Sequence, residues 1–166
     1  MIEVELKAIV NDIHKTKKTL ESFAEVERQY QKNDIYFKRD DFVVRIREDV
    51  QNIVTFKKKI IDNGIEVSEE NEFTVDNASL FTKFLGLSGY KEYYRKNKSG
   101  CSYKYDGLNF DLSLVNNIGW FLEIEKLVKH NKDVDSAKEQ IMKMLKRVGL
   151  EKCIESRTYE QLILGK

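Results

Sequence analysis

The chain has 166 residues, 41% of them hydrophobic and 34% charged, and this balance suits a single soluble domain spanning residues 1–166. Lys and Arg number 29 against 28 Asp and Glu, so the bulk positive charge of a nucleic-acid-binding protein is absent. We find no apolar run long enough for a membrane span and no signal peptide, and therefore expect a cytoplasmic protein without membrane or nucleic-acid partners. The two cysteines form neither a CxxC motif nor a disulfide framework.

Alternating polar and apolar residues predict the strands, and caps with 3.6-residue periodicity predict the helices. In chain order we expect a strand over 1–10, a helix over 12–24, strands over 26–39, 42–49, 51–60 and 66–75, a helix over 77–85, strands over 90–98, 101–106, 109–115 and 119–129, and helices over 134–148 and around 159–163. Asp62-Asn63-Gly64 and Asp106-Gly107 predict turns between neighbouring strands. Many strands joined by short turns indicate an α+β protein with a mostly antiparallel sheet.

Charged residues occupy alternate positions in at least seven segments, which places them on one face of each strand. Glu3, Glu5 and Lys7 share a face, for example, while Val4 and Leu6 point the other way. Over all strands the charged faces carry six glutamates and seven cations: Glu3, Glu5, Glu70, Glu72, Glu123 and Glu125, with Lys7, Arg45, Arg47, Lys57, Lys59, Lys96 and Lys98. If the amphipathic helices cover the apolar faces, the charged faces converge inside a closed antiparallel β-barrel, a tunnel with a charged interior and helices packed outside.

For any one segment, a solvated strand face is the more common explanation of this alternation. The set argues against that explanation because like charges are paired with like: Glu-x-Glu occurs three times, Lys-x-Lys twice and Arg-x-Arg once. Adjacent like charges on one strand face repel one another and need a counter-charge or a metal ion close by. The sequence therefore favours an interior that holds metal ions and a polyanion.

The order of these motifs resembles the CYTH, or triphosphate tunnel metalloenzyme, superfamily. Six motifs carry the resemblance together with the N-terminal Glu3-x-Glu5-x-Lys7: Asp34-x-Tyr36-Phe37, Arg45-x-Arg47, Thr55-x-Lys57, Glu70-x-Glu72, Lys96-x-Lys98 and Glu123-x-Glu125. The closing residues 158–162 look like the Ser-Tyr-x-x-Leu ending of the class IV adenylate cyclase branch. The resemblance covers essentially the whole chain.

The resemblance implies a tunnel that binds a triphosphate such as ATP together with Mg²⁺ or Mn²⁺. Phosphate binding would fall to Lys7, Arg45, Arg47, Lys57, Lys59, Lys96 and Lys98. Metal binding would fall to Glu3, Glu5, Glu123 and Glu125, with Glu70 and Glu72 close to the metal or positioning the cations. Both roles suit the chemistry, since preplaced cations stabilise charge that builds on phosphoryl oxygens and hard divalent ions prefer carboxylate oxygens.

Three functions stay open at this point, and no catalytic residue is assigned. A class IV type adenylate cyclase is favoured, a triphosphatase acting on inorganic or organic triphosphates is the alternative, and a non-catalytic phosphate-binding module is the third. Ser68 and Ser113 stand where the cyclase branch often has Arg and Asp, which could tune the substrate or weaken catalysis. The sequence also leaves a homodimer open.

Overall fold

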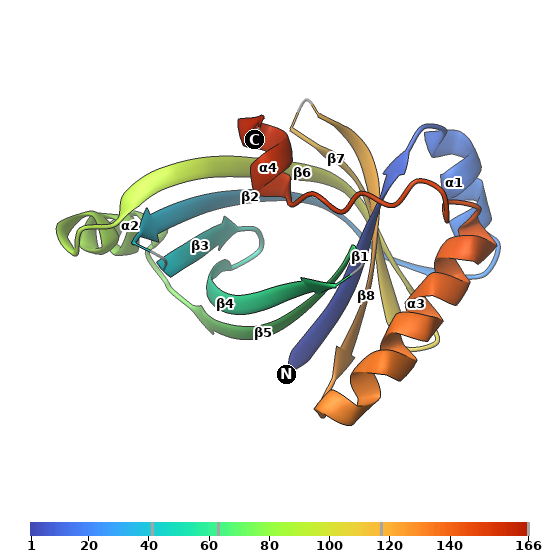
Figure 1. Ribbon diagram of the computed structural model, residues 1–166. Coiled ribbons are helices and arrows are strands. Elements are labelled where there is room, and N and C mark those ends of the chain that lie inside the picture. The colour runs from blue at the N-terminus through green and yellow to red at the C-terminus, as the bar shows by residue number, and fades with distance from the viewer. Residues whose placement is uncertain (41, 63, 117, 166) are drawn as a thin grey trace.

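A computed structural model of the chain describes residues 1–40, 42–62, 64–116 and 118–165, leaving aside the side chains of residues 57–60 and 62. The strands are β1 (Ile2–Val10), β2 (Glu25–Arg39), β3 (Phe42–Glu48), β4 (Asn52–Asp62), β5 (Ile65–Thr74), β6 (Lys91–Tyr105), β7 (Leu108–Val115) and β8 (Gly119–Val128). They close into one antiparallel barrel in the order β1-β5-β4-β3-β2-β6-β7-β8 (Figure 1). The predicted fold class, a closed antiparallel barrel with helices outside it, is confirmed.

The helices lie around the barrel rather than within it (Figure 1). They are α1 (Ile13–Glu21), α2 (Ala78–Leu87), the short 3-10 helix η1 (Asn131–Asp133), α3 (Val134–Val148) and α4 (Tyr159–Leu164). Asp12 and Asn77 cap α1 and α2, because each side-chain oxygen accepts a hydrogen bond from a backbone N–H of the first turn, at 2.9 Å in both helices. Among the described helices, none is both long and apolar enough to cross a membrane.

The main hydrophobic core lies outside the barrel wall, where α1 and α3 cover β1, β7 and β8. Leu6, Leu122 and Ile124 point outward from their strands and pack with Ile141 and Leu145 of α3, all essentially unexposed. A second cluster packs beneath α2 on the opposite side of the barrel, around Phe37, Ile46, Val54 and Leu85. Because strand side chains alternate, burying these apolar faces outward turns the charged faces inward.

One expectation about the strands is wrong: residues 90–98 and 101–106 are not separate strands but parts of the single strand β6. Ser99 and Gly100 read as a break, yet β6 pairs with β2 on one side and β7 on the other straight through them. Gly100 is required by close packing and not by a turn, since a Cβ atom there would lie 2.1 Å from the backbone oxygen of Leu112.

The C-terminal segment is held against β1. The pairing of β1 with β5 ends at Leu6 and Ile65, and beyond that point the segment before α4 takes the place of β5. The Ile9 amide donates to the Cys153 carbonyl oxygen at 2.8 Å, and Ala8 forms a bridge with Ile154. This attachment brings α4 to the barrel, where it lies against β6.

Candidate functional site

A cavity of about 520 Å³ occupies the barrel interior, and its lining is mostly charged. Eleven predicted site residues line this one cavity: Glu3, Glu5, Lys7, Arg45, Arg47, Glu70, Glu72, Lys96, Lys98, Glu123 and Glu125. The side chains of Lys57 and Lys59 lie outside the described residues, although their backbones pair with Glu70 and Ser68 of β5. The convergence inferred from alternation is therefore present for every predicted residue whose side chain is described.

Among the predicted site residues whose side chains are described, the two signs of charge occupy different arcs of the barrel wall. The neighbouring strands β3, β2 and β6 carry Arg45, Arg47, Lys96 and Lys98, whereas the predicted glutamates stand on the neighbouring strands β5, β1 and β8. Lys7 is the exception, because it lies on β1 among the glutamates. Its amino group donates to the backbone oxygen of Arg157 at 2.5 Å, and burial lowers its pKa despite nearby Glu5 and Glu123.

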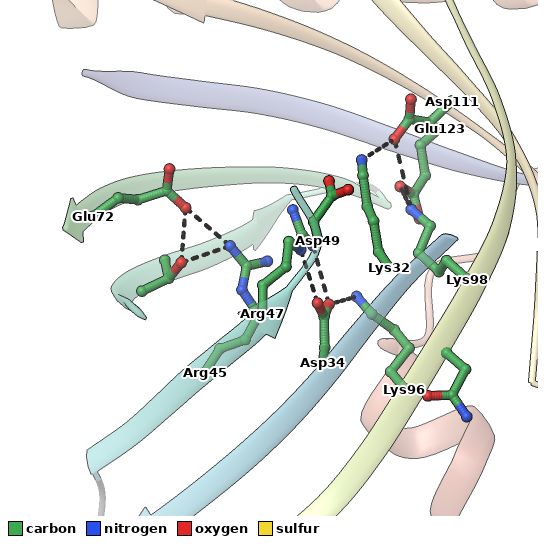
Figure 2. Close-up of polar contacts among 12 residues, drawn as sticks. Lys32, Asp34, Arg45, Arg47, Asp49, Glu72, Lys96, Lys98, Asp111 and Glu123 are labelled. Atoms are coloured by element: carbon green, nitrogen blue, oxygen red, sulfur yellow. Dashed lines mark hydrogen bonds and ion pairs between the residues drawn. The ribbon is translucent and has the colours of Figure 1, made fainter. Parts of the chain in front are cut away.

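Asp34 on β2 forms ion pairs with two residues of the cationic arc, Arg47 and Lys96 (Figure 2). Arg47 donates Nε to its Oδ1 at 2.8 Å and Nη2 to its Oδ2 at 3.0 Å, and Lys96 Nζ lies 3.3 Å from the same Oδ2. Burial alone would raise the pKa of this carboxyl, but Lys96 and Arg47 outweigh burial and hold its pKa well below the ordinary value. From the sequence, Asp34 was identified only as part of the Asp34-x-Tyr36-Phe37 motif, and no site role was predicted for it.

A second network joins the two arcs (Figure 2). Lys98 forms a close ion pair with Glu123 of β8 and lies 3.9 Å from Asp111 of β7, which also binds Lys32 at 3.1 Å. Burial opposes ionisation of Glu123, yet the charges of Lys98 and Lys96 lower its pKa to about 2. Sequence reasoning missed Lys32, although it shares the inward face of β2 with Asp34.

Arg45 retains a hydrogen-bond donor that no described group uses. Its Nη2 donates to Thr55 Oγ1 at 2.7 Å and to Glu72 Oε1 at 3.0 Å, and Thr55 Oγ1 in turn donates to Glu72 at 2.7 Å. Its Nε is buried and finds no partner within the described part of the chain. A buried donor of this kind at the wall of a cationic cavity suits an anionic oxygen.

The acidic arc contains a cluster that fits a divalent cation. Carboxylate oxygens of Glu3, Glu5 and Glu125 lie within 4.8 Å of one another. Burial, helped by the charges of Asp111 and Glu123, raises the pKa of Glu125 even though Asn109 Nδ2 donates to it at 2.7 Å. A hard cation reduces the repulsion between crowded carboxylates and prefers oxygen ligands. These three side chains therefore suit Mg²⁺ or Mn²⁺ by donor type. Glu123 is engaged by Lys98 instead.

Aromatic rings complete the lining of the cavity. Tyr36 and Tyr94 stack with centroids 4.1 Å apart, and both rings line the tunnel. Tyr159 enters from α4, with Lys7 Nζ 4.7 Å and Lys96 Nζ 4.9 Å from its ring centroid. Burial and the charge of Glu123 raise the pKa of Tyr159 well above its ordinary value, so the hydroxyl stays protonated. Tyr36 and Phe37 are neighbours on one strand, so their rings take opposite faces. This was the sequence signal that one aromatic ring points into the tunnel.

These features together define what the cavity can do. Cations held in fixed positions by ion pairs can bind the oxygens of a polyphosphate and stabilise charge that develops on them, without having to reorganise during a reaction. The carboxylate cluster supplies hard oxygen ligands that would suit a divalent cation, which would add positive charge to the same cavity.

Comparison with known proteins agrees with this arrangement. A candidate adenylate cyclase of Methanocaldococcus jannaschii is 29% identical over an alignment of 162 positions, and the match covers 92% of this chain and 92% of the relative. A conserved hypothetical protein of Pyrococcus furiosus has the same fold, with a TM-score of 0.85 and 28% identity over 96% of this chain and 99% of its own.

A candidate adenylyl cyclase of Hippeastrum, whose description reports a dominant triphosphatase activity, shares the fold at 16% identity. Its TM-score is 0.63, with 96% of its own chain and 99% of this one covered. The family model of the CYTH domain matches residues 1–159. The chain therefore belongs to the CYTH family, whose triphosphate tunnel enzymes depend on metal ions.

Proposed function

We propose that this protein is an enzyme that binds a triphosphate and a divalent cation in its tunnel. The observation that carries the proposal is the joint lining of one cavity by a cationic arc and a three-carboxylate cluster. A triphosphate carries about four negative charges near neutral pH, so it needs both the cations and the metal to leave water. Membership of the CYTH family supports the same assignment.

In this proposal the cations bind the phosphates and the glutamates bind the metal. Arg45 offers its buried Nε, while Arg47, Lys96 and Lys98 are held in place by Asp34 and Glu123. Glu3, Glu5 and Glu125 would hold Mg²⁺ or Mn²⁺, which when bound supplies positive charge that polarises phosphoryl oxygens. Lys57 and Lys59, whose side chains are not described, remain proposed phosphate ligands.

The favoured reaction is cyclisation of ATP to cyclic AMP. The ribose 3′-hydroxyl gives its proton to solvent and attacks the α-phosphorus, and the bond from that phosphorus to the bridging oxygen breaks, with its electron pair leaving on pyrophosphate. The positive arc stabilises the charge that grows on the leaving group. The name of the Methanocaldococcus jannaschii relative, which matches over nearly the whole chain, supports cyclisation.

Hydrolysis of the terminal phosphate is the second candidate. One observation favours it: Ser113, which is fully buried on the inward face of β7, offers a hydroxyl and not a carboxylate. The cyclase branch that the sequence resembles often has an aspartate there. A tunnel without that carboxylate could still direct water at the terminal phosphorus.

Product analysis separates the two reactions. The purified protein is incubated with ATP or with tripolyphosphate, each with Mg²⁺ and with Mn²⁺, and the products are resolved by anion-exchange chromatography. Cyclic AMP with pyrophosphate supports the cyclase, ADP or pyrophosphate with free phosphate supports the triphosphatase, and absence of any metal-dependent product contradicts both. Arg95→Gln should give the same products as the wild type, because Arg95 is an exposed arginine that pairs with Glu92 outside the tunnel.

A further inference from the structure

Two stacked tyrosines stand in a cavity whose other lining is mainly charged. The rings of Tyr36 and Tyr94 lie 4.1 Å apart, with 8° between their planes, and both line the cavity. They are direct partners in the β2–β6 register, next to the irregularity between Tyr36 and Phe37. The hydrophobic packing beneath α2 is provided by other side chains of this region, among them Phe37 and Ile35, so that core does not account for the inward rings.

We propose that the Tyr36–Tyr94 pair is a subsite for the aromatic base of a nucleoside triphosphate. This inference rests on the proposed function and deepens it, because it assigns two residues to the base, the part of a nucleotide that the proposed phosphate and metal ligands leave unbound. A flat apolar ring surface suits the π-face of a nucleobase, and stacking of this kind tolerates any base. A bare polyphosphate has no group that could use it.

The distance between the rings and the cations supports the assignment. Lys96 Nζ lies 5.6 Å from the Tyr36 ring centroid and 3.3 Å from Asp34, the carboxylate that Arg47 also binds. A phosphate bound by Lys96 would therefore place the attached nucleoside beside the tyrosines. Burial opposes ionisation of Tyr36, yet Lys96 and Arg45 outweigh it and lower the pKa of Tyr36, as expected for a hydroxyl that faces the cationic arc.

The pair also lies where the tunnel meets α4. Glu160 of α4 lines the same cavity and accepts a hydrogen bond from Tyr93 at 2.5 Å, and Tyr93 packs edge-on against Tyr94 at 5.5 Å. These contacts fix the ring of Tyr94 from a second side. A ring held in advance loses little conformational entropy when a base stacks on it.

The test compares two ligands that differ only in the nucleoside. One is an ATP analogue with both bridging oxygens replaced by methylene groups, and the other is the same methylene-bridged triphosphate without the nucleoside. Titration calorimetry in Mg²⁺ measures both affinities for the wild type, Tyr94→Leu and Tyr94→Phe. Tyr90→Leu is the matched control, since Tyr90 packs outside the cavity near Arg39. Thermal melting of each variant checks that the fold is retained.

We expect the wild type to bind the nucleotide at least about tenfold more tightly than the bare triphosphate, the size of one stacked base. Tyr94→Leu should remove that difference and leave the affinity for the bare triphosphate within about twofold, while Tyr94→Phe and Tyr90→Leu keep it. Equal weakening of both ligands, or no effect on either, overturns the subsite. A wild type that binds the bare triphosphate but prefers no nucleotide refutes this inference alone, whereas one that binds neither ligand refutes the proposed function as well.

Discussion

Arg47 binds Asp34 through two parallel hydrogen bonds, at 2.8 and 3.0 Å, and the carboxylate that it holds is only 1% exposed. The arginine therefore has a structural partner as well as a proposed substrate. Its neighbour on the same face, Arg45, is bound to Glu72, whose side chain is 44% exposed. The two arginines of the Arg-x-Arg motif should consequently respond differently to substitution.

Arg47→Ala should lower both stability and activity. Its loss leaves Asp34 buried with Lys96 as its remaining ion-pair partner, and breaking a buried pair costs about 3 kcal/mol of unfolding free energy. Loss of a charge-assisted phosphate contact should also lower kcat/KM by about a hundredfold. Arg45→Ala should show the loss of activity with a stability change below about 1 kcal/mol, because its partner is solvated. Denaturant unfolding and turnover measure both effects, and equal destabilisation by the two variants would disprove the distinction.

Asp34 should make the fold sensitive to acid. Its folded-state pKa lies below the value of 3.8 that it takes when unfolded, so its ion pairs stabilise the fold fully above about pH 4 and this stabilisation is lost as the pH falls further. Thermal melting from pH 7 to pH 2 should therefore show a decline that Asp34→Asn makes shallower, on top of a lower starting stability. A variant whose acid profile runs parallel to that of the parent would show that Asp34 does not carry the effect.

Metal binding should depend on Glu125 far more than on Glu72. Glu125→Gln removes one of three clustered carboxylates and should weaken Mn²⁺ binding at least about tenfold, whereas Glu72→Gln, beside Arg45, should change it little. Because burial and acidic neighbours raise the pKa of Glu125, protons compete with the metal and Mn²⁺ should bind more tightly as the pH rises. Titration calorimetry at several pH values provides both results; similar losses in the two variants would place the metal elsewhere.

Gly100 should tolerate no side chain. A Cβ atom would lie 2.1 Å from the Leu112 oxygen and 2.7 Å from Ser113 Cα, and both are backbone atoms of a closed barrel that cannot yield. Gly100→Val should therefore reduce the unfolding free energy by about 2 kcal/mol or more, measured by urea denaturation. Gly107→Ala is the comparison, since its Cβ would meet no neighbour and the cost would come only from the positive φ of 70°. A valine at position 100 that costs less than the turn variant would contradict the close approach.

The alternation of charge in the sequence was enough to predict the barrel and eleven of the residues that line it, because a period of two fixes which face a side chain takes. The alternation could not predict which charged residues form ion pairs with one another. Lys98 meets Glu123 and Arg47 meets Asp34 through the barrel register, which no local pattern reveals. Lys32 was missed because the other face of β2 there is polar too, with Gln29, Gln31 and Asn33, so no alternation marks the inward side.

The prediction of two separate strands in place of β6 was wrong for a related reason. Gly100 looks like a strand break when only the neighbouring residues are considered, and its purpose appears only with the backbone of β7 beside it. The stacking of Tyr36 on Tyr94 likewise depends on β2 pairing with β6 across a long separation in the chain.

Titration of tripolyphosphate into the wild-type protein in the presence of Mn²⁺ tests the tunnel site most directly. The account predicts one saturable site per chain, with an affinity that falls at least about tenfold in Lys98→Gln and is unchanged in Arg95→Gln on the outer face. Absence of saturable binding by the wild type, or equal affinity in all three proteins, would contradict a triphosphate site inside the barrel.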